Sequence, residues 1–196
     1  SCDKGRYQPD EGKQQCEICN AGLYQSSEGQ IKCKNCLAAR FGKTPGLTTN
    51  CPVCPKGYFQ NLPTKTSCTK CGTGQYQDQE EKTGCKDCDK GTYNEVPGSS
   101  VCLKCSNGRY LDLTQQKTAN SCKGCSKGRY GDQLGLKADA DCKVCEIGRY
   151  SGDVTGNENC QNCQGGRYNP STGKINEGDC LACGAGFYSD SLKQSS

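Results

Sequence analysis

Cysteine is the residue type in this chain best placed to do chemistry, because there are 21 cysteines and no histidine. All but Cys2 stand in Cys-x-x-Cys pairs. A pair with this spacing can serve as a redox site, as half of a zinc site, or as the ends of two disulfides. The pairs are Cys16/Cys19, Cys33/Cys36, Cys51/Cys54, Cys68/Cys71, Cys85/Cys88, Cys102/Cys105, Cys122/Cys125, Cys142/Cys145, Cys160/Cys163 and Cys180/Cys183.

The number and spacing of the pairs favour the structural interpretation. A redox motif uses one pair beside a strand-helix unit, whereas this chain repeats the pair and shows no sustained helical period. A four-cysteine zinc site would fit the intervals, but the odd cysteine count, the uniform spacing and the absence of histidine do not group the pairs into sites. We therefore expect disulfides, and no metal or cofactor.

The composition requires covalent links. Leu, Ile, Val and Phe together supply 23 of 196 residues, well below the ~20% that marks chains without enough apolar area to fold. The cysteine content exceeds the ~8–10% typical of disulfide scaffolds. Disulfides persist in oxidising compartments, so we expect an extracellular or cell-surface protein.

The charge and the lengths of the apolar runs argue against two classes of partner. The net charge is +4, from 25 basic and 21 acidic residues without a basic block, so we expect no nucleic-acid partner. No apolar run is long enough to cross a bilayer, so we expect no membrane insertion by this segment.

The elements that position the cysteines repeat every 17 to 20 residues, which is typical of a linear array. We number the repeats 1 to 11 by their opening cysteines: Cys2, Cys19, Cys36, Cys54, Cys71, Cys88, Cys105, Cys125, Cys145, Cys163 and Cys183. The third residue after each is glycine, except Ala39 in repeat 3, which suits a tight turn with positive φ or a close backbone approach. We interpret residues 1–196 as one continuous array, truncated in repeat 11 and part of a longer chain.

An aromatic ring stands five residues after every opening cysteine. The rings are Tyr7, Tyr24, Phe41, Phe59, Tyr76, Tyr93, Tyr110, Tyr130, Tyr150, Tyr168 and Tyr188. With so little aliphatic area, we expect each ring to cover the nearest disulfide. The predicted fold class is small and disulfide-rich: an elongated tandem array of short β-hairpin or loop modules, with little or no helix and no conventional hydrophobic core.

Two disulfide connectivities are compatible with the spacing. In the first, each opening cysteine pairs with the next cysteine, and Cys183 is left to bond with a residue beyond the segment. Those pairs are Cys2–Cys16, Cys19–Cys33, Cys36–Cys51, Cys54–Cys68, Cys71–Cys85, Cys88–Cys102, Cys105–Cys122, Cys125–Cys142, Cys145–Cys160 and Cys163–Cys180. In the second, neighbouring pairs link in parallel, such as Cys16–Cys33 with Cys19–Cys36, and Cys2 is the orphan. We favour the first because it makes every repeat one self-closed loop.

The stretches "CPKGYFQNLPTKTSCTKC" and "CDKGTYNEVPGSSVCLKC" carry a family resemblance. They resemble the ephrin-receptor-like cysteine-rich repeat and the single-disulfide module of tumour necrosis factor receptors. In that module the Cys-x-x-Gly-x-aromatic start is bonded to the next cysteine, so the resemblance supports the first connectivity. The chain lacks the two-disulfide modules that usually alternate with this one in those receptors.

All six arginines directly precede a ring. We interpret them either as outward strand residues lying over neighbouring rings, or as a ladder for lateral contact with another chain or an acidic glycan. The ladder would comprise Arg109, Arg129, Arg149 and Arg167. Glu80 and Glu81 are interpreted as a solvated loop tip, and nothing predicts an enzyme.

The function we expect is structural: a disulfide-stapled rod in a filament, surface appendage or coat. The alternative is the ligand-binding ectodomain of a receptor or adhesion protein. The expected partners are other copies of the chain or other extracellular proteins, with glycans as a further class.

Overall fold

The computed structural model describes residues 1–152 and 154–185, and the regular elements in these ranges are two-residue strands and three-residue 3₁₀ helices. The chain divides into two compact units, which we describe separately. Unit 1 comprises Ser1–Asp87 and Val96–Cys102, and unit 2 comprises Cys88–Glu95 and Leu103–Ser196. The small, disulfide-rich fold with little helix that the sequence predicts is confirmed.

Repeats 1, 2 and 4 to 10 each form one antiparallel hairpin, in which the strand that carries the ring pairs with the two residues inside the next Cys-x-x-Cys. The unit 1 hairpins are β1 (Arg6–Tyr7) with β2 (Glu17–Ile18), β3 (Leu23–Tyr24) with β4 (Lys34–Asn35), β5 (Tyr58–Phe59) with β6 (Thr69–Lys70), and β7 (Gln75–Tyr76) with β8 (Lys86–Asp87). Repeat 3 has a single bridge between Arg40 and Val53 instead.

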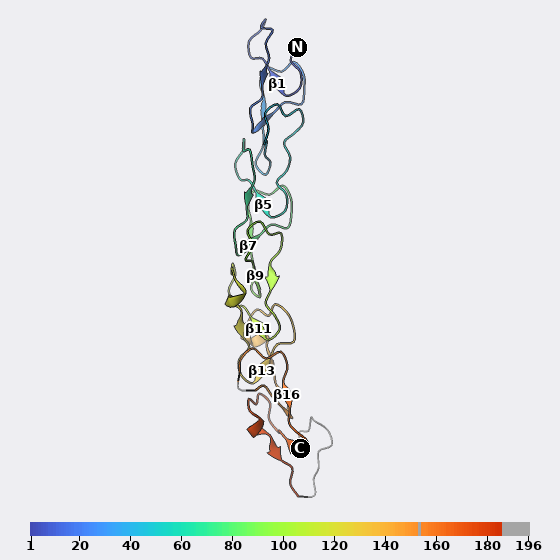
Figure 1. Ribbon diagram of the computed structural model, residues 1–196, viewed down its shortest axis with the longest axis vertical. Coiled ribbons are helices and arrows are strands. Elements are labelled where there is room, and N and C mark those ends of the chain that lie inside the picture. Colours follow the sequence, from blue (N-terminus) through green and yellow to red (C-terminus); the bar gives the residue numbers. More distant parts are fainter. Residues whose placement is uncertain (153, 186–196) are drawn as a thin grey trace. The chain divides into compact units, whose positions relative to one another are not determined.

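The same pairing recurs in unit 2. Its hairpins are β9 (Thr92–Tyr93) with β10 (Leu103–Lys104), β11 (Arg109–Tyr110) with β12 (Lys123–Gly124), β13 (Arg129–Tyr130) with β14 (Lys143–Val144), β15 (Arg149–Tyr150) with β16 (Gln161–Asn162), and β17 (Arg167–Tyr168) with β18 (Leu181–Ala182). Within each unit the hairpins follow one another in chain order, as β5 and β7 do in unit 1 and β11 and β13 in unit 2 (Figure 1).

The 3₁₀ helices absorb the extra length of the longest loops. They are η1 (Ala119–Ser121), η2 (Asp139–Asp141) and η3 (Glu177–Asp179), and each ends directly before a closing cysteine. The disulfides of these loops span 17 residues, whereas the other disulfides with described geometry span 14 or 15. A 3₁₀ turn shortens the path of the added residues, so the hairpin keeps its form.

In repeats 1 and 2, the glycine of the Cys-x-x-Gly turn is required for two reasons at once. Gly5 has a φ of +78°, a conformation that residues with a Cβ adopt at a cost. A Cβ placed on Gly5 would also overlap the backbone carbonyl of Gly46, two repeats further along. Gly22 makes the same close approach to Thr64. Both reasons that the sequence suggests for this glycine therefore apply.

Neighbouring repeats are joined by backbone hydrogen bonds. Between repeats 1 and 2, the N–H of Gly5 donates to the Gln25 carbonyl at 2.8 Å, that of Gln8 to Gln30 at 3.0 Å, and that of Gly29 to Cys2 at 2.8 Å. The same bonds recur between repeats 2 and 3, 3 and 4, and 4 and 5 in unit 1, and between repeats 6 and 7, 7 and 8, and 9 and 10 in unit 2. This pattern lets the repeats stack without a large apolar interface.

The residue directly after the ring, which we call the clamp position, is buried in repeats 2 to 10. Gln25 occupies it in repeat 2 and is 1% exposed. Its side chain donates to the Lys32 carbonyl at 2.7 Å and accepts the Ser27 N–H at 3.1 Å, which ties the loop together. Gln60 and Gln77 make the equivalent pairs of bonds in repeats 4 and 5.

Candidate functional site

The structure links nine cysteine pairs with Cα–Cα distances of 5.5 to 5.9 Å, inside the ~4.4–6.8 Å usual for disulfides. They are Cys2–Cys16, Cys19–Cys33, Cys36–Cys51, Cys54–Cys68, Cys71–Cys85, Cys105–Cys122, Cys125–Cys142, Cys145–Cys160 and Cys163–Cys180. Cys88 and Cys102 are also disulfide-bonded, and Cys183 is a free thiol in the described part of the chain. These nine pairs are those of the first connectivity.

The hairpin geometry separates the two cysteines of each Cys-x-x-Cys. In repeat 10, the strand β18 lies between Cys180 and Cys183. Three steps of extended chain separate two Cα atoms by about 10 Å, too far for a disulfide. A redox pair that closes and opens within one Cys-x-x-Cys is therefore incompatible with this fold. Residues 1–152 and 154–185 contain no cluster of three or more metal-binding side chains.

The arginines share one contact that the sequence does not reveal. Each donates a guanidinium hydrogen bond to the backbone carbonyl of the cysteine that closes its own loop. The bonds are Arg6 to Cys16 at 3.3 Å, Arg40 to Cys51 at 2.8 Å, Arg109 to Cys122 at 2.9 Å, Arg129 to Cys142 at 2.8 Å, Arg149 to Cys160 at 2.9 Å, and Arg167 to Cys180 at 3.1 Å. Such a bond satisfies a carbonyl beside a buried disulfide.

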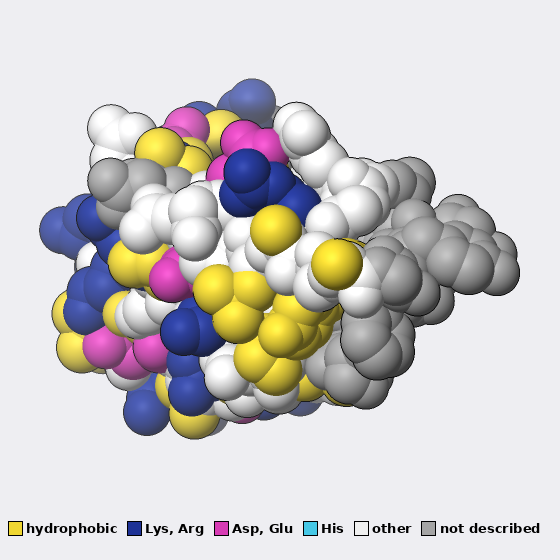
Figure 2. All heavy atoms as spheres, turned by 90° about the horizontal axis from the view of Figure 1, so that it is seen from below, with side chains coloured by type: hydrophobic (Ala, Val, Ile, Leu, Met, Phe, Trp, Pro, Cys, Tyr) yellow, Lys and Arg dark blue, Asp and Glu magenta, His cyan; other side chains and the backbone are white. Residues whose placement is uncertain are grey.

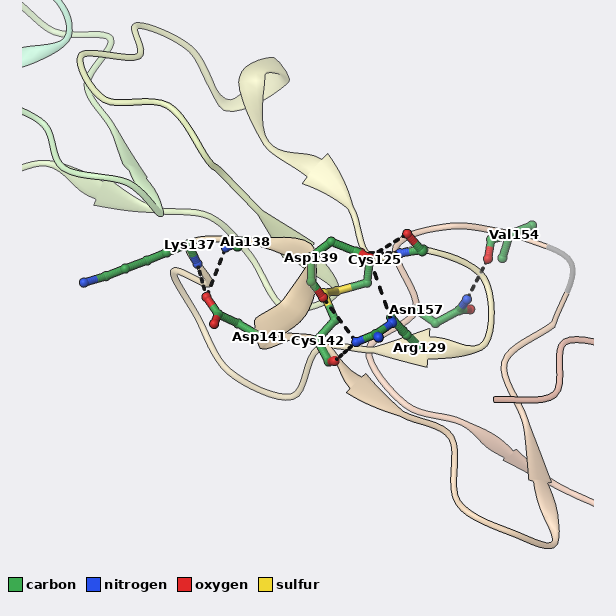
Figure 3. Close-up of a disulfide and its surroundings, with 10 residues drawn as sticks. Cys125, Arg129, Lys137, Ala138, Asp139, Asp141, Cys142, Val154 and Asn157 are labelled. Carbon is green, nitrogen blue, oxygen red and sulfur yellow. Dashed lines mark hydrogen bonds and ion pairs between the residues drawn. A yellow bond between two sulfur atoms is a disulfide. The ribbon is translucent and has the colours of Figure 1, made fainter. Parts of the chain in front are cut away.

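Repeat 8 shows the arrangement in detail. The Arg129 side chain points toward the Cys142 carbonyl and Asp139, beside the Cys125–Cys142 disulfide (Figure 3). Asp139 also accepts the N–H and the hydroxyl of Ser126, each at 2.8 Å. The carboxylate of η2 thus ties the loop to the start of its own repeat.

In the predicted arginine ladder, these carbonyl bonds therefore fix the orientation of each guanidinium group. Besides the carbonyl bond, Arg149 donates to Asn162 at 3.0 Å, and Arg129 lies 3.9 Å from Asp139. The cation–π contacts found in the described residues come from lysines: Lys86 lies 5.8 Å from the Tyr76 ring centre and Lys123 lies 5.9 Å from that of Tyr110.

Two rings are found in clusters with disulfides, and in both the disulfide belongs to the following repeat. Tyr93 of repeat 6 packs against Cys105 and Cys122 of repeat 7. Tyr150 of repeat 9 is 9% exposed and packs against the cysteines of repeat 10. The ring therefore joins neighbouring repeats in these two places. The other described rings are half-buried, and Tyr188 lies outside the described residues.

A lysine faces the ring across several hairpins and pairs with a nearby aspartate. Lys86 bonds Asp78 at 2.8 Å, Lys123 bonds Asp112 at 2.9 Å, and Lys143 bonds Asp132 at 2.6 Å. The hydrogen bond from the lysine lowers the pKa of each aspartate, and the same bond raises the pKa of each lysine. These pairs are exposed, and Lys86 and Lys123 lie over the rings of Tyr76 and Tyr110.

Glu81 has a more definite role than a solvated loop tip. Its backbone N–H donates to the Cys54 carbonyl at 2.9 Å, and its carboxylate lies 2.6 Å from the guanidinium of Arg40. This ion pair connects repeat 5 to repeat 3, next to Ala39, the one exception to the turn glycine. Glu81 remains exposed to solvent, with 48% of its side chain accessible, so it is a solvated loop residue that also makes these two contacts.

The surface mixes both signs of charge. In the view of Figure 2, Lys and Arg side chains are interspersed with Asp and Glu. None of the helices in the described part of the chain has the length and apolar character that crossing a membrane would require.

A comparison with protein-family models gives a match to part of the chain. The family model described as "Tyrosine-protein kinase ephrin type A/B receptor-like" matches residues 5–50. No curated protein matches the chain. The matched residues hold the hairpins β1–β2 and β3–β4, with the Cys19–Cys33 disulfide and the turn glycines Gly5 and Gly22.

The match favours the receptor-type interpretation over the filament interpretation. An ephrin-receptor-like module and a chain rich in disulfides point to the outside of the cell or the cell surface. The hairpin and disulfide pattern of residues 5–50 recurs through both units. The chain is therefore a tandem array of disulfide-bonded hairpin repeats, of which residues 5–50 match the ephrin-receptor-like family model.

Proposed function

We propose that this chain is part of a receptor-type or adhesion ectodomain that binds an extracellular protein partner, without enzymatic activity. The observation that carries the proposal is the match of residues 5–50 to the ephrin receptor-like family model. The fold supports it, because backbone hydrogen bonds and disulfides hold the repeats together while many loop residues are exposed to solvent.

A direct test is binding of the purified, oxidised chain to a library of extracellular proteins displayed on cells. We expect saturable binding to one partner with a Kd of micromolar or tighter, as is usual for specific recognition. The reduced and alkylated chain is the matched control, since it has the same sequence without the fold. Binding that persists in this control would mark the interaction as nonspecific.

Electron microscopy of the same preparation tests the filament interpretation. We expect dispersed particles at the concentrations used for binding. Regular fibres in which these repeats make the chain-to-chain contacts, together with no saturable partner, would overturn the receptor proposal in favour of a structural filament.

A further inference from the structure

A pocket of about 230 Å³ lies where repeats 6 and 7 meet, within unit 2. Its lining includes Tyr93, Lys104, Ser106, Arg109, Ala119 and Asn120. The adjoining core is well packed: Leu111 occupies the clamp position of repeat 7, is fully buried, and forms a cluster with Cys105, Cys122 and the Tyr93 ring. The pocket therefore borders a cluster of buried, closely packed side chains.

Two cations face this pocket. Lys104 comes from β10 and Arg109 from β11, and no acidic residue lines the pocket. Arg109 donates to the Cys122 carbonyl at 2.9 Å, which fixes the guanidinium while its other N–H groups stay available. The Lys104 stem lies beside Gly135. Glu95 accepts the Ala119 N–H at 2.8 Å and so holds η1 in place next to the pocket.

This pair of cations occurs once among the arginine-bearing repeats. Arg109 has a lysine five residues before it, inside the preceding Cys-x-x-Cys, and no other arginine has a basic residue there. The corresponding residues are Ser1 for Arg6, Asn35 for Arg40, Gly124 for Arg129, Val144 for Arg149 and Asn162 for Arg167. Repeat 7 is thus a local departure from a regular array, which is where a recognition site is expected.

We propose that this pocket binds the carboxylate of an Asp or Glu side chain presented by an extracellular protein partner, an assignment that rests on the proposed function. A planar guanidinium is suited to bidentate pairing with a carboxylate, and the lysine adds a second positive charge. The volume is smaller than the ~300–1,000 Å³ of small-molecule sites, so a single charged group fits better than a larger ligand.

The distribution of charge favours a protein carboxylate over a long sulfated glycan. A polyanion would be matched by pairs of cations at successive repeats, whereas the next two arginines along the chain lack the lysine and already interact with Asp139 and Asn162. One isolated two-cation pocket suits one acidic side chain.

The test is an NMR titration of the full 196-residue oxidised chain with a tetraglutamate peptide, and with a tetraglutamine peptide as a control for charge. We expect saturable shifts of the Ser106, Arg109 and Asn120 signals with tetraglutamate only. Lys104→Gln should weaken this binding by about 5-fold, as expected for one exposed charge pair.

Lys70→Gln is the matched control variant. Lys70 occupies the equivalent position in β6 and its stem lies beside Gly98, as that of Lys104 lies beside Gly135, but Gln75 stands where an arginine would complete the pocket. We expect Lys70→Gln to bind tetraglutamate as the wild type does. Equal weakening by both variants would show nonspecific attraction and overturn the proposal.

Two further outcomes would also overturn it. One is the absence of saturable shifts at the pocket. The other is stronger binding of a sulfated hexasaccharide, with shifts that extend over several repeats, because this would assign the cations to a glycan. Binding of a protein partner that Lys104→Gln leaves unchanged would refute this pocket while leaving the proposed function intact.

Discussion

At the scale of single residues, two glycines with positive φ show what the absence of a Cβ atom contributes. Gly12 and Gly22 both have φ near +80°, at +80° and +85°. They differ in their surroundings, because a Cβ on Gly12 would meet nothing within 4 Å, whereas one on Gly22 would overlap the Thr64 carbonyl. The two positions therefore separate the cost of the backbone conformation from the cost of the close approach.

We predict that Gly12→Ala lowers the free energy of unfolding by about 1–2 kcal/mol, the cost of a left-handed conformation. Gly22→Ala should cost at least about 1 kcal/mol more, because the backbone of repeat 4 must move away from the new methyl group. Urea denaturation under non-reducing conditions measures both. Equal losses for the two variants would show that the close approach does not contribute.

The exposed Asp–Lys pairs give a prediction about pH. The bond from Lys86 lowers the pKa of Asp78 below its ordinary value of 3.8, so its stabilising effect is complete above pH 3.8 and is lost as the pH falls through the lower folded value. The pKa of Lys86 is raised above its ordinary value of 10.5. At high pH the stabilising effect of the pair is therefore complete below pH 10.5 and is lost as the pH rises through the raised pKa of the folded state.

Carboxyl NMR titration checks this directly. We expect the Asp78 midpoint to lie below 3.8 in the wild type, and to rise in Lys86→Gln because the positively charged hydrogen-bond donor is lost. Asp112 with Lys123→Gln provides an independent repeat of the measurement in unit 2. A midpoint that does not respond to loss of the lysine would refute the assigned cause.

At the scale of the hairpin, the clamp glutamine replaces a hydrophobic core. We predict that Gln25→Met lowers the free energy of unfolding by about 1–3 kcal/mol, because the Lys32 carbonyl and the Ser27 N–H lose their partner. Thermal unfolding of the oxidised protein measures the loss. Gln14→Met, at an exposed position, is the control and should change stability by less than about 0.5 kcal/mol. If both variants behave alike, the clamp does not contribute.

At the scale of the whole molecule, the stability of the fold depends on the disulfides. Each closes a loop of 14 to 17 residues in the nine described geometrically. Restricting the unfolded chain in this way contributes about 3 kcal/mol per bridge in the chain-entropy model. We predict that full reduction removes the dispersion of amide NMR signals, since little apolar core would remain.

Peptide mapping under non-reducing conditions tests the connectivity. We expect linked peptides for the nearest-neighbour pairs, and alkylation of one thiol, Cys183, after unfolding without reductant. Peptides that join Cys16 to Cys33 would refute this connectivity and favour the one in which neighbouring Cys-x-x-Cys pairs link in parallel. Stoichiometric zinc with free thiols would refute the disulfide interpretation altogether.

The sequence by itself determined the features that lie within one loop. The repeat period, the turn glycine and the short strand at the ring follow from spacing over fewer than twenty residues, because local backbone geometry and loop closure decide them. The composition indicated in the same way that cross-links must replace a core. The stretches quoted from repeats 4 and 6 resemble the ephrin-receptor-like module, and the family match to residues 5–50 supports this resemblance.

Only the tertiary structure decided the contacts between repeats and across each loop. Tyr93 and Tyr150 pack on disulfides of the following repeats, Glu81 reaches Arg40, and the arginines bond the closing cysteines. Lys104 and Arg109 meet at one pocket for the same reason. These contacts depend on how each repeat is rotated against the next, and the backbone hydrogen bonds between repeats set that rotation, so the spacing of side chains along the sequence does not show it.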